Sequence, residues 1–136
     1  MSDRKPRRIL LVDDEPSILK VVGRRLELAG YEVVTALDGE EGLSKAKLGR
    51  PDAIILDLMM PKLNGFEVCA QLKGDPAHQH IPIIIFTAKG KEMDERLCRE
   101  IGADAYISKP MQATALLEQL EALLGNVLPG SPPASS

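Results

Sequence analysis

Five short apolar runs, each followed by a segment with helical periodicity, constrain the fold of this chain more than any other feature. Each run is rich in Ile, Val or Leu and is bounded by turn residues or charges. Strands that alternate with helices favour a parallel sheet with helices on both faces, so we predict an α/β fold. The runs lie at residues 8–12, 32–36, 53–57, 82–87 and 104–108.

The segments between these runs place apolar residues three or four positions apart. Residues 16–29, for example, carry Ile18, Val22 and Leu26 on one face, and Gly30 follows as a stop signal. Right-handed crossovers between parallel strands then leave few topologies. We predict helices over residues 16–29, 39–48, 64–73, 91–101 and 112–124.

Length and composition indicate one globular domain that works in the cytoplasm. We expect residues 7–124 to fold, with a flexible segment at 1–6 and a flexible tail at 125–136 that is rich in Gly, Pro and Ser. The net charge of -3 argues against binding to nucleic acid or to an anionic membrane. No signal peptide or membrane span is evident, and we expect Cys69 and Cys98 to be reduced core residues.

Polar groups follow four of the five predicted strands. Asp13 and Asp14 follow the first strand, Asp57 ends the third, Thr87 ends the fourth, and Lys109 follows the fifth. The carboxyl ends of parallel strands meet at one edge of the sheet, where such folds place their chemistry. Any one of these residues alone is explained by a solvated loop, but their coincidence indicates a site.

Each of these side chains has a chemical use in phosphoryl transfer. Clustered carboxylates bind a hard divalent cation, and Mg²⁺ fits a site with few protein oxygens. Asp57 is a carboxylate nucleophile that would form an acyl phosphate. Thr87 offers a hydroxyl donor to the phosphoryl group, and Lys109 offsets part of the negative charge. The sequence therefore predicts a pocket shared by Mg²⁺ and a phosphoryl group.

Four motifs make residues 7–124 resemble a bacterial response-regulator receiver domain of the chemotaxis type. They are LLVDDE, IILDLMMPKLNGFE, IIIFTA and GADAYISKP, and they are specific only together. The resemblance implies a flavodoxin-like (βα)5 fold with strand order 2-1-3-4-5. It also implies a regulatory phosphoacceptor of a two-component system, whose phosphotransfer and autodephosphorylation are self-catalysed.

The resemblance assigns roles to particular residues. Asp57 would be phosphorylated by a histidine kinase or a histidine phosphotransfer protein. Asp13 and Asp14 would bind Mg²⁺, with Asp14 the more direct ligand, and Asp57 and the main-chain carbonyl of Met59 would complete the protein ligands. On phosphorylation the Thr87 hydroxyl would move toward the phosphoryl group, while the ring of its switch partner, Tyr106, turns inward.

The resemblance also concerns the surrounding loops and the output surface. The Lys109–Pro110 peptide bond would be cis, which only proline makes cheap. Pro61 and Gly65 would shape the loop after the phosphorylation site. The signal would be a population shift in the surface of the fourth helix, the fifth strand and the fifth helix.

Three positions should flank the phosphoryl group: Met59, Ala88 and Lys89. We hypothesise that Met59 limits the approach of water and that Lys89 pairs with the phosphoryl group, so that together they slow hydrolysis. The alternative is that Met59 and Lys89 point to solvent.

Partners and rival functions follow from what the sequence lacks. Residues 112–124 contain no Lys or Arg, whereas receivers that dimerise before DNA-binding domains carry an arginine there, so we expect a monomer or weak dimer. We expect a stand-alone receiver that signals by protein contact, with a fragment of a longer regulator or hybrid kinase as the alternative.

Two rival functions do not fit the sequence. A haloacid-dehalogenase-type phosphatase would need an acid at Met59. A flavin carrier would need a phosphate-binding loop in place of Asp13, Asp14 and Glu15.

Overall fold

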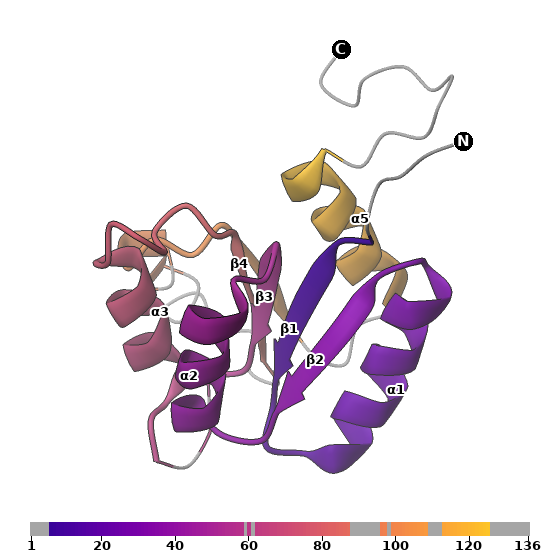
Figure 1. Cartoon of the computed structure of the whole chain (residues 1–136), viewed down its shortest axis with the longest axis horizontal. Coiled ribbons are helices and arrows are strands. Elements are labelled where there is room, and N and C mark those ends of the chain that lie inside the picture. The colour runs from indigo at the N-terminus through magenta and orange to yellow at the C-terminus, as the bar shows by residue number, and fades with distance from the viewer. Residues whose placement is uncertain are drawn as a thin grey trace.

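A five-stranded parallel sheet forms the centre of the computed structural model, which describes residues 6–58, 60, 62–87, 96–97, 99–108 and 113–125. The strand order is β2-β1-β3-β4-β5, which confirms the predicted topology. All four pairs are parallel, so the strands end at one common edge (Figure 1). The strands are β1 (Arg8–Val12), β2 (Glu32–Ala36), β3 (Ala53–Leu56), β4 (Ile83–Thr87) and β5 (Ala105–Ser108).

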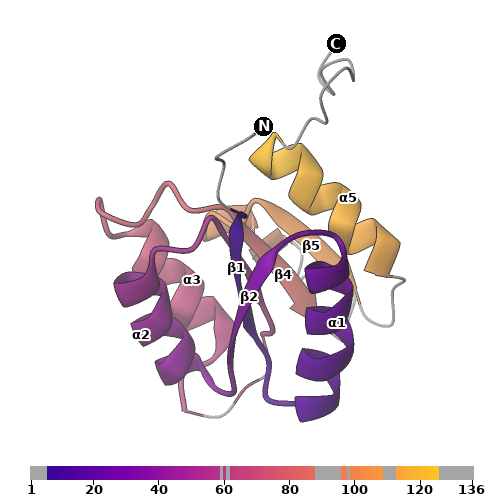
Figure 2. The same cartoon turned by 45° about the vertical axis from the view of Figure 1, so that its right-hand side comes forward.

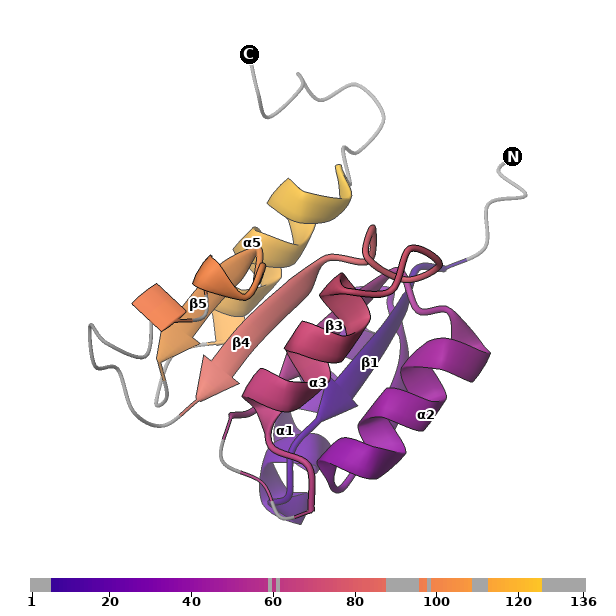
Figure 3. The same ribbon diagram turned by 90° about the vertical axis from the view of Figure 1, so that its left-hand side faces the viewer.

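Helices cover both faces of this sheet, as the alternating pattern predicted. The helices α1 (Pro16–Leu28) and α5 (Ala113–Leu124) lie on one face, and α2 (Gly39–Gly49) and α3 (Gly65–Lys73) lie on the other (Figures 2 and 3). Of the expected helix at 91–101, residues 96, 97, 99 and 100 are helical and Ile101 already lies in a turn, while residues 91–95 and 98 lie outside the described residues. None of the described helices has the length and apolarity that crossing a membrane requires.

Two apolar cores fill the layers on either side of the sheet. Successive residues of β1 alternate between them, because side chains of a strand point to opposite faces. Ile9 and Leu11 pack in the cluster that contains Leu26 of α1, whereas Leu10 and Val12 pack with the residues of α2 and α3. The four residues Ile9–Val12 are at most 1% exposed. Burial on both faces explains why this strand is a continuous apolar run rather than an alternating one.

Asp104 and Lys73 form hydrogen bonds that hold the starts of β4 and β5 together. The Asp104 carboxylate accepts hydrogen bonds from the Ile83 backbone N–H at 2.8 Å and from the Lys73 ammonium at 3.0 Å. The same ammonium donates to the carbonyl oxygens of Gln79 and Ile81. Asp104 was predicted to begin the last strand, but its side chain is used to tie the starts of β4 and β5 together, and β5 begins one residue later.

Candidate functional site

Asp13 and Asp14 are placed by the end of β1 and the start of α1. The Asp13 backbone N–H donates to the Ala36 carbonyl at 3.1 Å, which continues the β1–β2 ladder one residue past the strand. One Asp13 carboxylate oxygen accepts the Glu15 backbone N–H at 3.0 Å. Pro16 then opens α1, a position where its missing N–H costs nothing. The chain therefore turns sharply and leaves both carboxylates at the sheet edge.

Asp57 lies beside them, directly after β3. Its backbone N–H donates to the Val12 carbonyl at 3.0 Å, so the aspartates of neighbouring strands end at the same level. The helix α3 packs closely on this turn, and the Gly65 N–H donates to the Leu58 carbonyl at 3.0 Å. A Cβ on Gly65 would lie 2.8 Å from the Leu58 Cα, which leaves no room for any other residue there.

The three carboxylates form one acidic cluster. One oxygen of each of Asp13, Asp14 and Asp57 lies within 4.8 Å of the others. Asp13 is 1% and Asp57 5% exposed, while Asp14 is exposed to solvent. Like charges this close repel one another, and a divalent cation bound between them would remove the repulsion. An all-oxygen donor set with one solvent-facing side fits Mg²⁺, which keeps several of its waters.

Thr87 ends the strand beside β3 and is 1% exposed. The β4–β5 register pairs Ile85 with Tyr106 and Thr87 with Ser108. Since side chains alternate along a strand, Thr87, Ile85 and Tyr106 lie on one face of the sheet, the face that α2 and α3 cover. The expected switch pair therefore lies on the same face of the sheet. Tyr106 is half-buried and is paired with Ile85, two residues before Thr87 and so farther from the edge that carries the site.

Several predicted site residues lie outside the described residues: Met59, Pro61, Ala88, Lys89, Lys109 and Pro110. Lys109 follows Ser108, the β5 residue paired with Thr87, in the sequence. Of the two cysteines, Cys69 is buried in the core, as predicted, and Cys98 lies outside the described residues.

The loop after Asp57 is held against α2 by contacts that the sequence analysis did not find. The Lys62 ammonium lies 3.5 Å from the Asp38 carboxylate, and Lys62 has a positive φ of 69°. Asp38 is the N-cap of α2 and accepts the Glu41 backbone N–H at 2.8 Å. That hydrogen bond, with a smaller effect of Lys62, holds the pKa of the Asp38 carboxyl below its ordinary value. Leu63 packs against the first turn of α2 at Gly39, where no side chain fits.

A capping box begins α3 directly after these loop residues. Asn64 accepts the Glu67 backbone N–H at 3.0 Å, and the Glu67 carboxylate accepts the Asn64 N–H at 3.1 Å. The spacing Asn-x-x-Glu is a recognisable start signal for a helix, so sequence reasoning could have found this cap. The two helix starts together hold residues 62–64, the part of the loop that leads from Asp57 into α3.

Comparisons with known proteins agree with this geometry. Residues 9–121 match the response regulator receiver domain. The chain is 46% identical over 118 residues to the alkaline phosphatase synthesis transcriptional regulatory protein PhoP of Bacillus subtilis, an alignment that covers 87% of this chain and 48% of that protein. The chain thus spans about half the length of the curated relatives it matches.

Solved structures show the same fold along nearly the whole domain. A chemotaxis response regulator of Vibrio cholerae has a TM-score of 0.82 and 35% identity, covering 88% of this chain and 100% of that one. The receiver domain of a sensor histidine kinase from Pseudomonas aeruginosa has a TM-score of 0.82 and 30% identity, covering 89% and 99%. That structure holds a magnesium ion in its active-site cleft.

Proposed function

This chain belongs to the response regulator receiver domain family, and on that premise we propose that it is a phosphorylation-dependent switch of a two-component system. The observation that carries the proposal is the cluster of Asp13, Asp14 and Asp57 beside the buried Thr87. A carboxylate nucleophile, a cation site and a hydroxyl donor lie at one sheet edge. Phosphoryl transfer needs these groups together, because catalysis of this reaction is largely positioning and charge stabilisation.

The phosphoryl group would pass to Asp57 from a phosphohistidine of a histidine kinase or phosphotransfer protein. A carboxylate oxygen of Asp57 attacks phosphorus, the new O–P bond forms as the P–N bond breaks, and the electron pair stays on the donor imidazole nitrogen. Asp13, Asp14, Asp57 and the Met59 carbonyl are the proposed ligands of Mg²⁺. When bound, Mg²⁺ neutralises charge on the transferred phosphoryl oxygens.

Lys109, Thr87 and Tyr106 complete the proposed machinery. Lys109 would contact a phosphoryl oxygen as a point charge. The Thr87 hydroxyl would donate to another, and its movement would free space on the sheet face that it shares with Tyr106. An inward turn of the half-buried Tyr106 ring would then change the outer surface of the fourth helix, β5 and α5.

The lifetime of the acyl phosphate is proposed to depend on Met59 and Lys89. Both stand two residues after a site residue, Met59 after Asp57 and Lys89 after Thr87. An apolar side chain at the first position would exclude water, and an ammonium at the second would pair with the phosphoryl oxygens. Dephosphorylation should be faster in Met59→Asn and in Lys89→Glu, and unchanged rates in both would remove this part of the proposal.

Several observations bear on the setting and on the rival functions. Asp57 follows β3 rather than β1, and the residue two positions later is Met59 rather than an acid, which argues against a haloacid-dehalogenase-type phosphatase.

We propose a regulatory protein of the cytoplasm whose folded domain covers residues 7–124. It would act as a monomer or weak dimer, because α5 lacks the basic residue that a receiver dimer would pair with acids.

A phosphoryl mimic tests the switch without a partner protein. Beryllofluoride with Mg²⁺ should shift the backbone amide NMR signals around Asp57 and also those of Tyr106 and α5. Thr87→Val, which removes the hydroxyl but keeps the side-chain shape, should retain the shifts near Asp57 and lose the distant ones. Asp57→Asn is the control that should show neither. Wild-type shifts confined to the surroundings of Asp57 would contradict the proposed output.

A further inference from the structure

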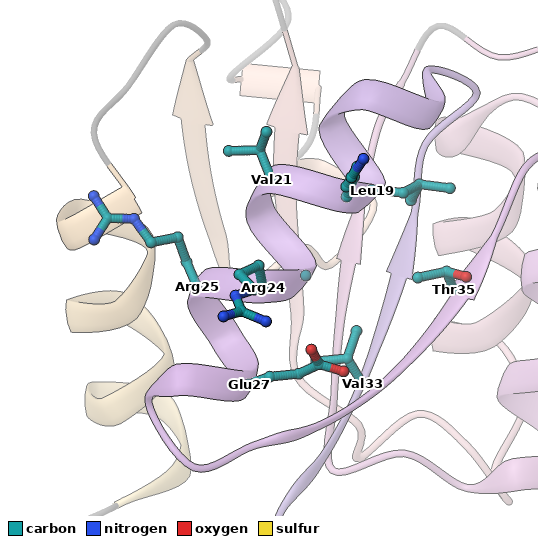
Figure 4. Close-up of a pocket in the computed structure, with 9 residues that line it drawn as sticks. Leu19, Val21, Arg24, Arg25, Glu27, Val33 and Thr35 are labelled. Carbon is teal, nitrogen blue, oxygen red and sulfur yellow. The ribbon is translucent and has the colours of Figure 1, made fainter.

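A groove of about 700 Å³ runs between α1 and the outermost strand, β2. Leu19, Val33 and Thr35 form its floor, and Lys20, Arg24 and Glu27 rise along its α1 wall. In Figure 4, Glu27 extends over β2, whereas Arg25 points away from β2, toward α5. We call this hollow the α1–β2 groove. The phosphotransfer chemistry described above uses none of these residues.

The floor of the groove presents backbone groups that the sheet does not use. In a parallel ladder, alternate residues of a strand bond to the same neighbour. Glu32 donates its N–H to Arg7, and Ala36 accepts the N–H of Asp13, so the even-numbered positions face β1. Val33 and Thr35 therefore turn their backbone N–H and C=O groups outward. In the described sheet, β2 has β1 as its single neighbour.

Part of this outer edge is already covered by α2. The Lys45 ammonium donates to the Thr35 carbonyl at 2.6 Å, and the Glu41 carboxylate accepts the Leu37 N–H at 2.8 Å. Lys45 and Glu41 also pair with each other at 2.9 Å. Charged residues of this kind protect an edge against unrestricted strand pairing. The backbone N–H and C=O of Val33 and the backbone N–H of Thr35 remain at the part of the edge that Lys45 and Glu41 do not cover.

The wall beside this open part is basic. Lys20 and Arg24 are exposed, and among the ion pairs between described residues none includes either of them or Glu27. Two cations stand against one carboxylate, which lies toward the end of α1. The floor between them is partly apolar, because the half-buried side chains of Leu19 and Val33 form part of it. The groove therefore combines positive charge, apolar surface and free strand edge.

We propose that the α1–β2 groove binds an extended, acidic segment of a partner protein as an added strand beside β2. The segment would exchange backbone hydrogen bonds with Val33 and Thr35, which supply affinity in strand addition. Its acidic side chains would point to the α1 side of the sheet, where their carboxylates would face Lys20 and Arg24 and their methylene groups would cover Leu19 and Val33, while the residues between them would point to the other face. Glu27 would oppose acidic residues at its end of the groove and so fix the register.

The test adds a peptide with blocked termini and the sequence Thr-Glu-Val-Asp-Val-Glu-Thr to the whole chain. Backbone amide NMR of the chain detects binding of the peptide. We expect saturable shifts at the Val33 and Thr35 amides. Two control peptides separate the contributions: one carries Lys at the three acidic positions, and the other is N-methylated at two consecutive central residues. Consecutive residues of a strand point their N–H groups to opposite edges, so the second control blocks pairing in either orientation.

Variants of the groove should change the affinity in opposite directions. The double variant Lys20→Glu/Arg24→Glu should raise the Kd about tenfold, since it reverses two surface ion pairs. Glu27→Gln should lower the Kd, and Lys45→Ala should lower it too because it frees the Thr35 carbonyl. Lys47→Glu, an exposed charge reversal on α2, should leave it unchanged.

Three outcomes would overturn the proposal. They are no saturable shift at Val33 and Thr35 at millimolar peptide, equal binding of either control peptide, and a Kd that the double variant leaves unaltered. Phosphorylation of Asp57 by a small donor should be the same in the groove variants as in the wild type, which separates this proposal from the switch function. Far-UV circular dichroism confirms that each variant is folded.

Discussion

The acidic cluster predicts that the metal-free protein becomes more stable when one of its carboxylates loses its charge. Asp13→Asn is the sharpest change. An asparagine keeps a side-chain oxygen that can accept the Glu15 backbone N–H, so the turn into α1 is retained. The new amide group can also donate to the remaining carboxylates. What the variant removes is one negative charge from a group of three.

The magnitude follows from the geometry of the cluster. Two unit charges 4.8 Å apart repel by about 3.5 kcal/mol at an effective dielectric constant of about 20 and by about 0.9 kcal/mol in water. Asp13 takes part in two such pairs. Asp14 is exposed, which favours the lower bound, so we expect the free energy of unfolding to rise by about 2 kcal/mol. That corresponds to an increase in Tm of about 5–10 °C for a domain of this size.

Urea unfolding in metal-free, low-salt buffer measures this difference. Added Mg²⁺ should stabilise the wild type more than Asp13→Asn, because ligand binding stabilises only the form that binds it, and the two curves should converge. High salt should shrink the difference by screening. Glu118→Gln, on the exposed side of α5, is the control and should change little. A variant less stable than the wild type without metal, or an equal response of both to Mg²⁺, would refute the reasoning.

Three further changes test the surroundings of the site. Gly65→Ala should cost about 1–3 kcal/mol in urea unfolding because its Cβ meets backbone, whereas Gly49→Ala, with nothing within 4 Å, should not destabilise. The pKa of the Asp38 carboxyl is lower in the folded protein than its ordinary value of 3.8. The ionised carboxylate therefore contributes fully to the free energy of unfolding above pH 3.8, and this contribution is lost as the pH falls through the lower pKa of the folded state. Asp38→Asn should therefore flatten the acid limb of a stability–pH curve. Lys73→Met should cost about 1–3 kcal/mol in thermal unfolding because it removes the donor to the part-buried Ile81 carbonyl and to the Asp104 carboxylate, and Lys47→Met should cost little.

The sequence predicted the fold and the main site because strand ends are visible in it. The apolar run before Asp13 stops where the chain meets the charged residues, and the runs before Asp57 and Thr87 stop within one residue of the observed strand ends. Parallel strands must bring such ends together, so the cluster could be expected without coordinates. Asp57 itself lies just after β3, and its N–H still donates to the Val12 carbonyl, which continues the β1–β3 ladder one residue past the strand.

The contacts that hold the site in place could not be predicted in the same way. The ion pair of Lys62 and Asp38 joins segments whose sequences carry no signal for each other. Gly65 was singled out by resemblance, but its physical reason, the approach of α3 to the backbone of Asp57 and Leu58, is a tertiary contact. Such contacts depend on how helices settle on the sheet, and periodicity reports only which face is buried.

The α1–β2 groove is another feature that periodicity conceals. Lys20, Arg24 and Glu27 appear in the sequence as an ordinary solvated helix face. Their significance depends on β2 lying at the edge of the sheet, which is a property of the topology. The outward groups of Val33 become a binding edge only beside that helix.

The phosphoacceptor role of Asp57 can be measured directly by intact mass after incubation with a small-molecule phosphodonor, with and without Mg²⁺, for the wild type and Asp57→Asn. The wild type should gain a single phosphoryl adduct that depends on Mg²⁺ and is absent in the variant. An adduct that persists in Asp57→Asn, or one that forms equally without Mg²⁺, would contradict the assignment of this site.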